Sequence, residues 1–402
     1  MTACSSDGFA GATLGGGSEG GRAPLRGRLR VLHLMSCRGW SSDAYWAARV
    51  AVELERAGHD VTLCCRAGTE VPVIERAREL GARRIETLTL RGGFRPRDDL
   101  SDLRWLRDRL PRFDLVHVHR GKEHWLAALA NRLSTNPRPL IRTRHIVQAV
   151  RPHAANRWLY RTQTSLVVTV TEAIRRQYLA AGLVPAERVV ALPGGVDADR
   201  FYPGLDGSAV RRELQIPDDT LLVGLVSGLR VMKGHGVVLE AASLLGWDGV
   251  RPHFLFIGKG GQEEWIRASI RRAGLDGQVT LVGFVPDLPA AMSALDIALY
   301  VPVESDGMSR VVFECLALGR PLVASRVGVV PEILVDGRDA LLVPAGEPGL
   351  LAEAIRRLVA DPGLRTSIGL AGRRLVAERY SGARVAAQLA DLYAGLVGGR
   401  GQ

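Results

Sequence analysis

Short apolar runs alternate with amphipathic stretches along almost the whole chain. Runs such as RLRVLHLMS (28–36), LVHVH (115–119) and SLVVTV (165–170) have the length and composition of buried strands. An amphipathic helical pattern follows the first run over residues 43–57 and ends at Gly58. Strands that alternate with helices predict parallel sheets with helices on both faces. The fold class that we expect is therefore α/β.

The alternation pauses once, in GGVDADRFYPGLDGSA (194–209), and then resumes with apolar runs such as LLVGLVSG (221–228). A segment rich in Gly, Pro and Asp is typical of a connection between domains. We therefore predict two Rossmann-like, doubly wound domains that face a central cleft, with the ligand at the carboxyl ends of the strands. The expected boundaries are a disordered Gly-rich tail over 1–28, an N-terminal domain over 29–200, a C-terminal domain over 201–380, and a helix over 381–402 that returns to the N-terminal domain.

The positive charge is confined to one half of the chain. The protein has 402 residues and a net charge of +11, but residues 1–200 carry +12 and residues 201–402 carry −1. Three interpretations are open: a nucleic acid partner, an anionic membrane or substrate, or arginines spread over solvated faces. Aromatic residues are only 5% of the chain and form no stacking pattern, so we expect no nucleic acid partner.

We expect a cytoplasmic protein. No apolar run approaches the about 18–20 residues that span a bilayer, and residues 1–20 lack the basic start and apolar core of a secretory signal. The chain has five cysteines without a Cys-x-x-Cys pair, which favours reduced thiols over a disulfide framework.

The segment ESDGMSRVVFECLALGRPLVAS (304–325) carries the strongest candidate chemistry. A strand ends before it, and a helix is expected to start near Ser309, whose hydroxyl would cap it. The amides of residues 307–310 would then lie at a helix N-terminus, which favours phosphate. The carboxylates of Asp306 and Glu314 flank this position and suit sugar hydroxyls. An ordinary capped helix fits the same spacing.

Cations and glycines follow other strands of the second half. SGLRVMKGH (227–235) places Arg230 and Lys233 where they could neutralise a diphosphate, although a solvated loop is an equal alternative. Only three lysines occur in the chain, which makes Lys233 more noticeable. GKGG (258–261) lacks the spacing of a phosphate-binding Walker loop, so a simple turn is favoured and a loop close to a phosphate is the alternative. GFVPD (283–287) fits either a turn or a loop that reads a base edge.

Two histidines of the first half follow strands. His119 in HVHRGKEHW (117–125) and His145 in RTRHI (142–146) are expected to face the cleft between the domains. A purely structural histidine is the commoner alternative. No cluster has the spacing of a metal site, so none is predicted.

Together these segments resemble a known enzyme family. DGMSRVVFE (306–314), PLVASRVGVVPEILVDGRDALLVPAGEP (321–348) and RVVALPGGVDADRFYPG (188–204) resemble the retaining glycosyltransferases of family 4, also called glycosyl transferases group 1. The resemblance extends over about residues 29–396. It implies the GT-B fold, in which two Rossmann-like domains face each other.

The resemblance also implies roles for single residues. Arg230 and Lys233 would bind the donor diphosphate, and Glu314 the ribose hydroxyls. Asp306 would contact the donor sugar, which His145 would approach from the first domain. The further donor-binding positions are Gly228, Val285 near the base, Gly307, Met308, Ser309 and Arg310. The acceptor-side positions are Gly39, Ser41 and His119.

The activity that the resemblance implies is transfer of a sugar from a nucleotide sugar to a glycan or lipid-linked acceptor, with retention at the anomeric carbon and without a metal cofactor. A role in cell-envelope polysaccharide or lipopolysaccharide synthesis, with peripheral contact to an anionic membrane, would suit the basic first half. Asp306 replaces the usual Glu, Ser309 a common Gly, and GWSSDAYW (39–46) the usual Gly-Gly and Glu. These departures keep two alternatives open: a catalytically degenerate nucleotide-sugar-binding protein and a nucleotide-sugar epimerase.

Overall fold

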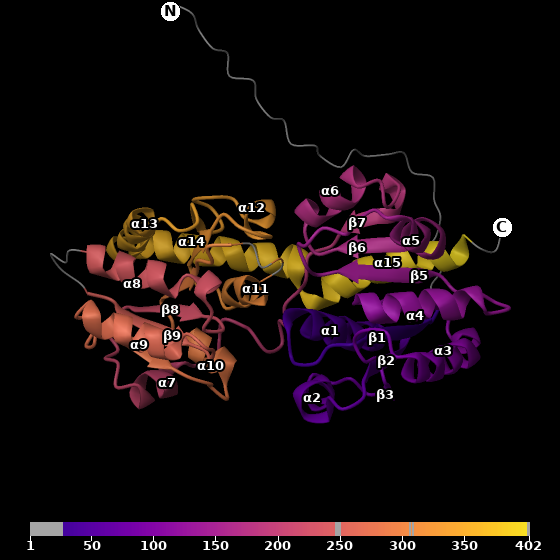
Figure 1. The fold of residues 1–402 in the computed structure, drawn as a ribbon. Helices are drawn as coiled ribbons and strands as arrows, with labels where there is room; N and C mark the ends of the chain where they lie inside the picture. Colours follow the sequence, from indigo (N-terminus) through magenta and orange to yellow (C-terminus); the bar gives the residue numbers. More distant parts are fainter. Residues whose placement is uncertain (1–26, 246–250, 305–306, 308, 400–402) are drawn as a thin grey trace, which may run out of the picture.

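The protein consists of two α/β domains that lie side by side (Figure 1). The structure is a computed structural model that describes residues 27–245, 251–304, 307 and 309–399. Most of the predicted tail over 1–28, and the site candidates Asp306 and Met308, lie outside these described residues.

Each domain is built on one parallel sheet. The first sheet has the strand order β3-β2-β1-β4-β5-β6-β7, and the second has the order β10-β9-β8-β11-β12-β13. The strands are β1 (Arg30–Met35), β2 (Asp60–Arg66), β3 (Ile85–Leu88), β4 (Leu115–Val118), β5 (Leu140–Arg144), β6 (Leu166–Thr169), β7 (Val189–Ala191), β8 (Leu222–Val226), β9 (His253–Ile257), β10 (Val279–Val282), β11 (Ile297–Tyr300), β12 (Leu322–Ser325) and β13 (Leu341–Val343). Both orders reverse beside the first strand of the sheet, which is the switch point where doubly wound folds bind ligands. The prediction of two doubly wound domains is confirmed.

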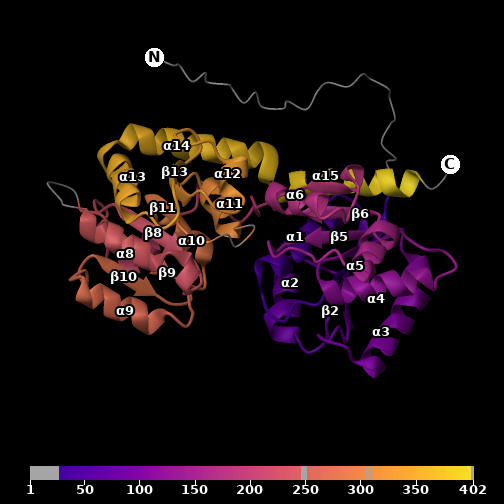
Figure 2. The same ribbon diagram turned by 45° about the horizontal axis from the view of Figure 1, so that its top comes forward.

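Helices cover both faces of each sheet because the strands are buried and apolar on both sides (Figures 1 and 2). The helices are α1 (Ser42–Arg56), α2 (Arg76–Glu79), α3 (Pro96–Arg109), α4 (Gly121–Arg132), α5 (Ala154–Trp158), α6 (Glu172–Ala180), α7 (Ser208–Glu213), α8 (His235–Leu244), α9 (Glu263–Arg272), α10 (Leu288–Ser293), α11 (Arg310–Ala317), α12 (Val330–Ile333), α13 (Pro348–Ala360), α14 (Pro362–Leu375) and α15 (Gly382–Gly398).

The chain crosses between the domains twice, and the two crossings are hydrogen-bonded to each other. The Val196 amide donates to the Tyr380 carbonyl over 3.0 Å, and the Gly382 amide donates to the Val196 carbonyl over 2.8 Å. A Cβ on Gly195 would lie 3.0 Å from the Ser381 backbone. The second crossing leads into α15, which lies against α1 on the first domain (Figure 2).

A buried ion pair fastens the first crossing to α1. The Arg49 guanidinium donates to the Asp197 carboxylate over 2.7 Å and also pairs with Glu53 one turn along the helix. All three side chains are less than 10% exposed. Since a buried charge is stable only when it is paired, this contact holds α1 and the crossing in one arrangement.

Within the described residues, no helix has both the length and the apolar character that crossing a membrane requires. Cys37, Cys64, Cys65 and Cys315 are all buried free thiols.

We predict that Asp197→Ala lowers the free energy of unfolding by about 3 kcal/mol, because it leaves the buried Arg49 charge with one carboxylate in place of two. Chemical denaturation measures the change. The matched control is Asp199→Ala. The Asp199 carboxylate is 76% exposed, and the substitution removes its ion pair with Arg56. That variant should differ from the parent by less than about 0.5 kcal/mol. Equal losses in the two variants would contradict the role given to Arg49.

Candidate functional site

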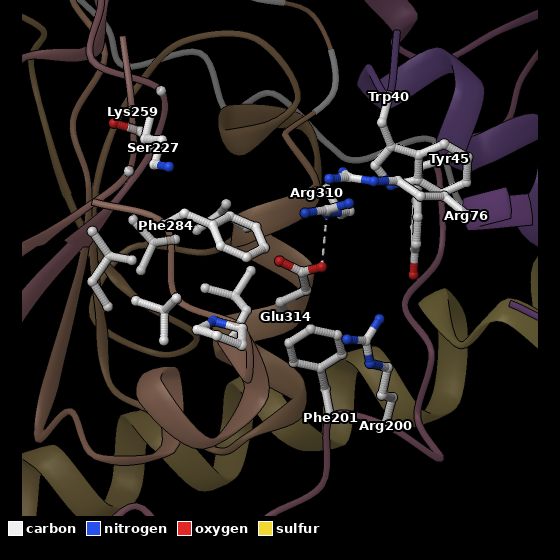
Figure 3. A pocket seen from close by; sticks show the side chains of 18 of the residues that line it. Trp40, Tyr45, Arg76, Arg200, Phe201, Ser227, Lys259, Phe284, Arg310 and Glu314 are labelled. Atoms are coloured by element: carbon white, nitrogen blue, oxygen red, sulfur yellow. Dashed lines mark ion pairs between the residues drawn. The ribbon is translucent and has the colours of Figure 1, made fainter. Parts of the chain in front are cut away.

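A cavity of about 610 Å³ lies between the two domains (Figure 3). The first domain supplies Trp40, Tyr45, Arg76, Glu79 and Leu80 to its lining. The crossing segment supplies Arg200 and Phe201, and the second domain supplies Val226, Ser227, Gly228, Ile257, Gly258, Lys259, Gly283, Phe284, Val285, Pro286, Leu288, Arg310, Val311 and Glu314. The cavity therefore lies at the carboxyl ends of β8, β9 and β10, where the doubly wound topology predicted a ligand.

The turns after these strands pack backbone against backbone. Gly258 has φ +154°, and a Cβ there would lie 1.9 Å from the Ser227 carbonyl oxygen. A Cβ on Gly260 would lie 2.3 Å from the Leu229 carbonyl oxygen. Any side chain at these two positions would force the turns after β8 and β9 apart. GKGG is thus more than a simple turn, because it brings Lys259 to the cavity wall.

Glu314 is a buried carboxylate at the cavity wall. It lies in α11 and is 1% exposed. Its Oε1 accepts a hydrogen bond from Arg310 Nε over 2.8 Å, whereas Oε2 has no hydrogen-bond partner among the described residues. Burial raises the pKa of Glu314, and the Arg310 charge opposes that rise. A buried carboxylate oxygen without a partner is costly, so this atom is suited to a ligand that donates hydrogen bonds.

Arg310 connects the two domains. Its guanidinium carbon lies 4.7 Å from the ring centroid of Tyr45, which belongs to α1 of the first domain (Figure 3). The same guanidinium pairs with Glu314 on its own helix. Arg310 therefore neutralises the buried carboxylate and contacts the opposite wall of the cavity.

Arg230 and Lys233 lie on the loop that continues from Ser227 and Gly228. Neither lines the cavity itself; Arg230 is exposed, and Lys233 is 9% exposed. A Cβ on Gly234, which has φ +81°, would lie 1.9 Å from the Val301 carbonyl oxygen. This close approach packs the loop against the segment that follows β11.

The loop before α11 touches the first domain at His145. Gly307 has φ +79°, and a Cβ there would lie 2.8 Å from the His145 carbonyl oxygen. Ser309 occupies the N-cap position of α11 and is 6% exposed, but its hydroxyl makes no capping hydrogen bond. The predicted hydroxyl cap is therefore wrong. The first amides of α11 donate no hydrogen bond to the Ser309 hydroxyl, which leaves them available to an anion at this helix terminus.

The loop after β1 is held by charged contacts. Ser41 donates to Asp43 through its hydroxyl and to the Gly39 carbonyl through its amide, the latter over 2.9 Å. Arg120 pairs with Asp43 over 2.6 Å. Burial alone would raise the pKa of Asp43, but the neighbouring His145, Ser41 and Arg120 together hold it below its usual value.

The expectation that His119 faces the cleft is wrong. Its side chain is 1% exposed and lies between His33 and His145, with a nitrogen 3.2 Å from each of them. Because His119 follows β4 in the middle of the sheet, its ring packs among the neighbouring strands. His145, which follows the next strand, β5, lies beside Gly307 of the second domain.

The structure thus brings Gly228, Val285, Arg310 and Glu314 into one cavity and places His145 beside Gly307. Sequence analysis missed Tyr45, Lys259 and Phe284. Lys259 Nζ lies 5.5 Å from the ring centroid of Phe284, which is 61% exposed. The scarcity of lysine in this chain was a signal for Lys259, but no pattern in the sequence pairs α1 with α11.

Family models match both domains. The model described as Glycosyltransferase Family 4 matches residues 44–200, and the model described as Glycosyl transferases group 1 matches residues 220–361. The chain is 30% identical to an alpha-D-kanosaminyltransferase of Streptomyces kanamyceticus over 58% of its own length and 60% of that protein. It is 28% identical to a D-inositol 3-phosphate glycosyltransferase of Acidothermus cellulolyticus over 64% of its own length and 61% of that protein. The matched region thus spans about three fifths of these curated relatives.

Solved structures share the fold. A glycosyltransferase of Rickettsia africae superimposes with a TM-score of 0.81 at 18% identity, covering 92% of this chain and 99% of that one. The Anabaena protein HepE in complex with UDP-glucose gives a TM-score of 0.76 at 20% identity, covering 92% of this chain and 100% of that one. Two family models that match in succession, one on each domain, agree with this two-domain fold. The chain belongs to the family 4, group 1 glycosyltransferases, with the GT-B fold.

Proposed function

We propose that this protein transfers a sugar from a nucleoside diphosphate sugar to a hydroxyl of a glycan or lipid-linked acceptor, with retention at the anomeric carbon and without a metal ion. The observation that carries the proposal is the buried Glu314 carboxylate at the wall of the interdomain cavity, whose Oε2 has no partner in the part of the chain that the structure describes. The curated relatives named above are transferases, and HepE was solved with UDP-glucose.

Different parts of the cavity suit the base, the ribose and the diphosphate of a nucleotide. Phe284 and Val285 offer an apolar surface for the base. Glu314 can accept hydrogen bonds from both ribose hydroxyls, in place of or beside Arg310. The diphosphate then extends past Gly228 toward Lys233 and the N-terminus of α11.

The chemistry follows from the charges around the diphosphate. The bond between the anomeric carbon and the diphosphate oxygen breaks, the acceptor oxygen bonds to the same face of that carbon, and its proton passes to the leaving diphosphate. The negative charge that grows on the diphosphate is stabilised by Arg230, Lys233 and the helix amides, which supports a reaction without a metal. Closure of the two domains excludes water and limits hydrolysis of the donor.

Same-face attack explains retention better than a double displacement, which needs a carboxylate nucleophile beside the sugar. Among the described residues, the carboxylates that line the cavity are Glu79 and Glu314. Glu314 pairs with Arg310, and Glu79 belongs to α2 of the first domain.

An arginine cluster on the first domain supports an anionic acceptor. Arg66 ends β2, and Arg38, Arg91 and Arg95 lie on the loops after β1 and β3. Burial together with these three charges lowers the pKa of Arg66. A Cβ on Gly92 would lie 2.9 Å from a guanidinium nitrogen of Arg38. Cations gathered at the carboxyl edge of this sheet fit an acceptor, or a membrane surface that carries it, with phosphate groups. This role would place the enzyme in cell-envelope synthesis at a cytoplasmic membrane face.

We predict that one class of nucleotide sugar stabilises the protein and is slowly hydrolysed in EDTA. Panels of UDP-, GDP-, ADP- and TDP-sugars, followed by thermal shift and product analysis, test both effects. Glu314→Ala should abolish the thermal shift, because the ribose loses its buried acceptor. Lys233→Ala should keep the nucleotide shift but lower turnover by about 10²–10³-fold, the cost of losing one charge-stabilising donor.

The matched control for this experiment is Glu263→Ala in α9, which removes a partly exposed carboxylate that is not in the cavity lining. It should behave as the parent does. Stabilisation without any turnover would support the degenerate-binder alternative, and recovery of an epimerised nucleotide sugar would support the epimerase. Near-normal turnover by Lys233→Ala would refute the assignment of the diphosphate.

We predict that the protein binds vesicles of phosphatidylcholine and phosphatidylglycerol more tightly than vesicles of phosphatidylcholine alone. The double variant Arg38→Gln with Arg66→Gln should weaken this binding by about 10- to 30-fold, at about 1 kcal/mol per cation. Co-sedimentation measures it, and added glycerol phosphate tests whether a soluble phosphate ester competes.

The control here is Arg271→Gln with Arg272→Gln, which removes two exposed arginines from α9 of the second domain. It should leave vesicle binding unchanged. Equal binding to both kinds of vesicle, or equal losses in both double variants, would argue against an acceptor-side role of the cluster.

A further inference from the structure

A chain of hydrogen-bonded side chains runs through the interior of the first domain. It begins at Thr143, whose Oγ1 lies 2.6 Å from His117 Nε2. His117 Nδ1 lies 2.5 Å from Tyr393 Oη, and Tyr393 Oη lies 3.2 Å from His33 Nε2. All four of these side chains are fully buried.

The chain continues from His33 to the cleft. His33 Nδ1 lies 3.2 Å from His119 Nε2, and His119 Nδ1 lies 3.2 Å from His145 Nε2. His145 is the partly exposed end of the chain and lies beside Gly307 of the second domain. Its Nε2 faces His119, and Nδ1 has no hydrogen-bond partner among the described residues, although the charges of Asp43 and Arg120 act on the same ring. Nδ1 is therefore the ring nitrogen that remains for a ligand.

The link through Tyr393 comes from the last described helix. His33, His117 and Thr143 lie on β1, β4 and β5, whereas Tyr393 lies on α15, which follows the second crossing. The return of α15 to the first domain therefore completes the chain of contacts.

The four imidazoles are neutral at pH 7. Burial lowers the pKa of His33 and of His145 to about 3. Burial also lowers the pKa of His117 and of His119 well below the usual value, and the neighbouring histidines lower both further. Each ring therefore has one N–H and one nitrogen lone pair.

Thr143, at the buried end of the chain, determines which atom donates in each hydrogen bond. The Thr143 hydroxyl is buried, and among the described residues its hydrogen-bond partner is His117 Nε2 alone. If Nε2 donated to Thr143, the hydroxyl hydrogen would have no acceptor, which is unfavourable in a buried site. Thr143 therefore donates to His117.

Every later bond follows from that first one. His117 then holds its hydrogen on Nδ1 and donates to Tyr393, and Tyr393 donates to His33. His33 and His119 each donate from Nδ1 to the next ring, because their Nε2 atoms are acceptors. Reversing one ring would set two hydrogens against each other in one contact and two lone pairs in another. The chain is therefore uniform.

We propose that this chain holds His145 as the neutral tautomer with its hydrogen on Nδ1, so that His145 is a hydrogen-bond donor to an oxygen of the bound sugar or phosphate and not a base. Thr143, His117, Tyr393, His33 and His119 are positioning residues that act through His145. The identity of the oxygen rests on the proposed function, but the tautomer does not.

Binding of a metal ion is the alternative role for three of these histidines. His33, His117 and His119 offer nitrogen atoms that lie within 4.8 Å of one another. Both nitrogens of His117 are already within hydrogen-bond distance of oxygens, on Tyr393 and Thr143, and both nitrogens of His119 face other imidazoles. This pairing favours the hydrogen-bonded chain.

The test is the ¹⁵N NMR spectrum of ¹⁵N-histidine-labelled protein at pH 7 without any sugar, with the His145 signals assigned from His145→Gln. We expect His145 to be protonated on Nδ1. Tyr393→Phe, which keeps the ring but removes the hydroxyl, and Thr143→Val, which removes the first donor, should each populate the Nε2–H form of His145. In a transferase assay each variant should lower kcat by about tenfold with little change in the donor KM, the size that loss of an orienting contact has at other sites.

The matched control is Tyr178→Phe, which removes a buried hydroxyl that bonds to Tyr160 in the same domain but outside the chain. It should leave the His145 spectrum unchanged. The proposal is overturned if His145 is protonated on Nε2 in the parent, if its tautomer persists in both Tyr393→Phe and Thr143→Val, or if chelation removes a stoichiometric metal and shifts the histidine signals. A protein with the expected tautomer but no transferase activity would refute the proposed function alone.

Discussion

The double crossing between the domains is the constraint on which the rest of the structure depends. Hydrogen bonds join Val196 to Tyr380 and Gly382, and the buried Arg49 fastens the first crossing to α1. Because both crossings pass this one place, it sets where the two domains are joined. The cavity lies beside it, with Arg200 and Phe201 from the first crossing in its wall, so the same contacts shape the cavity.

Close backbone approaches shape the second half of the site. Gly258, Gly260 and Gly234 each stand where a Cβ would collide with a neighbouring carbonyl group. These approaches hold the turns after β8 and β9 in place without side chains between them. The charged groups are then added to a rigid frame, with Glu314 and Arg310 on α11 and Lys259 on the turn after β9. A rigid frame of this kind holds charged groups in place before a ligand arrives.

Buried polar groups in the first domain have a different basis. Histidines occupy the middle of a largely apolar sheet, and Tyr393 of α15 packs against them. Each of these side chains is stable there because the next one completes its hydrogen bonds. Such a chain connects the packing of α15 to His145 at the cleft. It also explains why His119, which follows a strand as His145 does, is not at the surface.

The sequence by itself determined the alternation of strands and helices, the break near residue 200, and the positions of Glu314, Lys233 and His145 within motifs. These features depend on local periodicity and on spacing along one segment, which a sequence records directly. The structure alone decided that Tyr45 meets Arg310, that Lys259 reaches the cavity, that the Ser309 hydroxyl leaves its helix uncapped, and that Tyr393 joins His117 to His33. Each of these contacts depends on how distant segments pack or on how a side chain turns, and no local pattern encodes either of them.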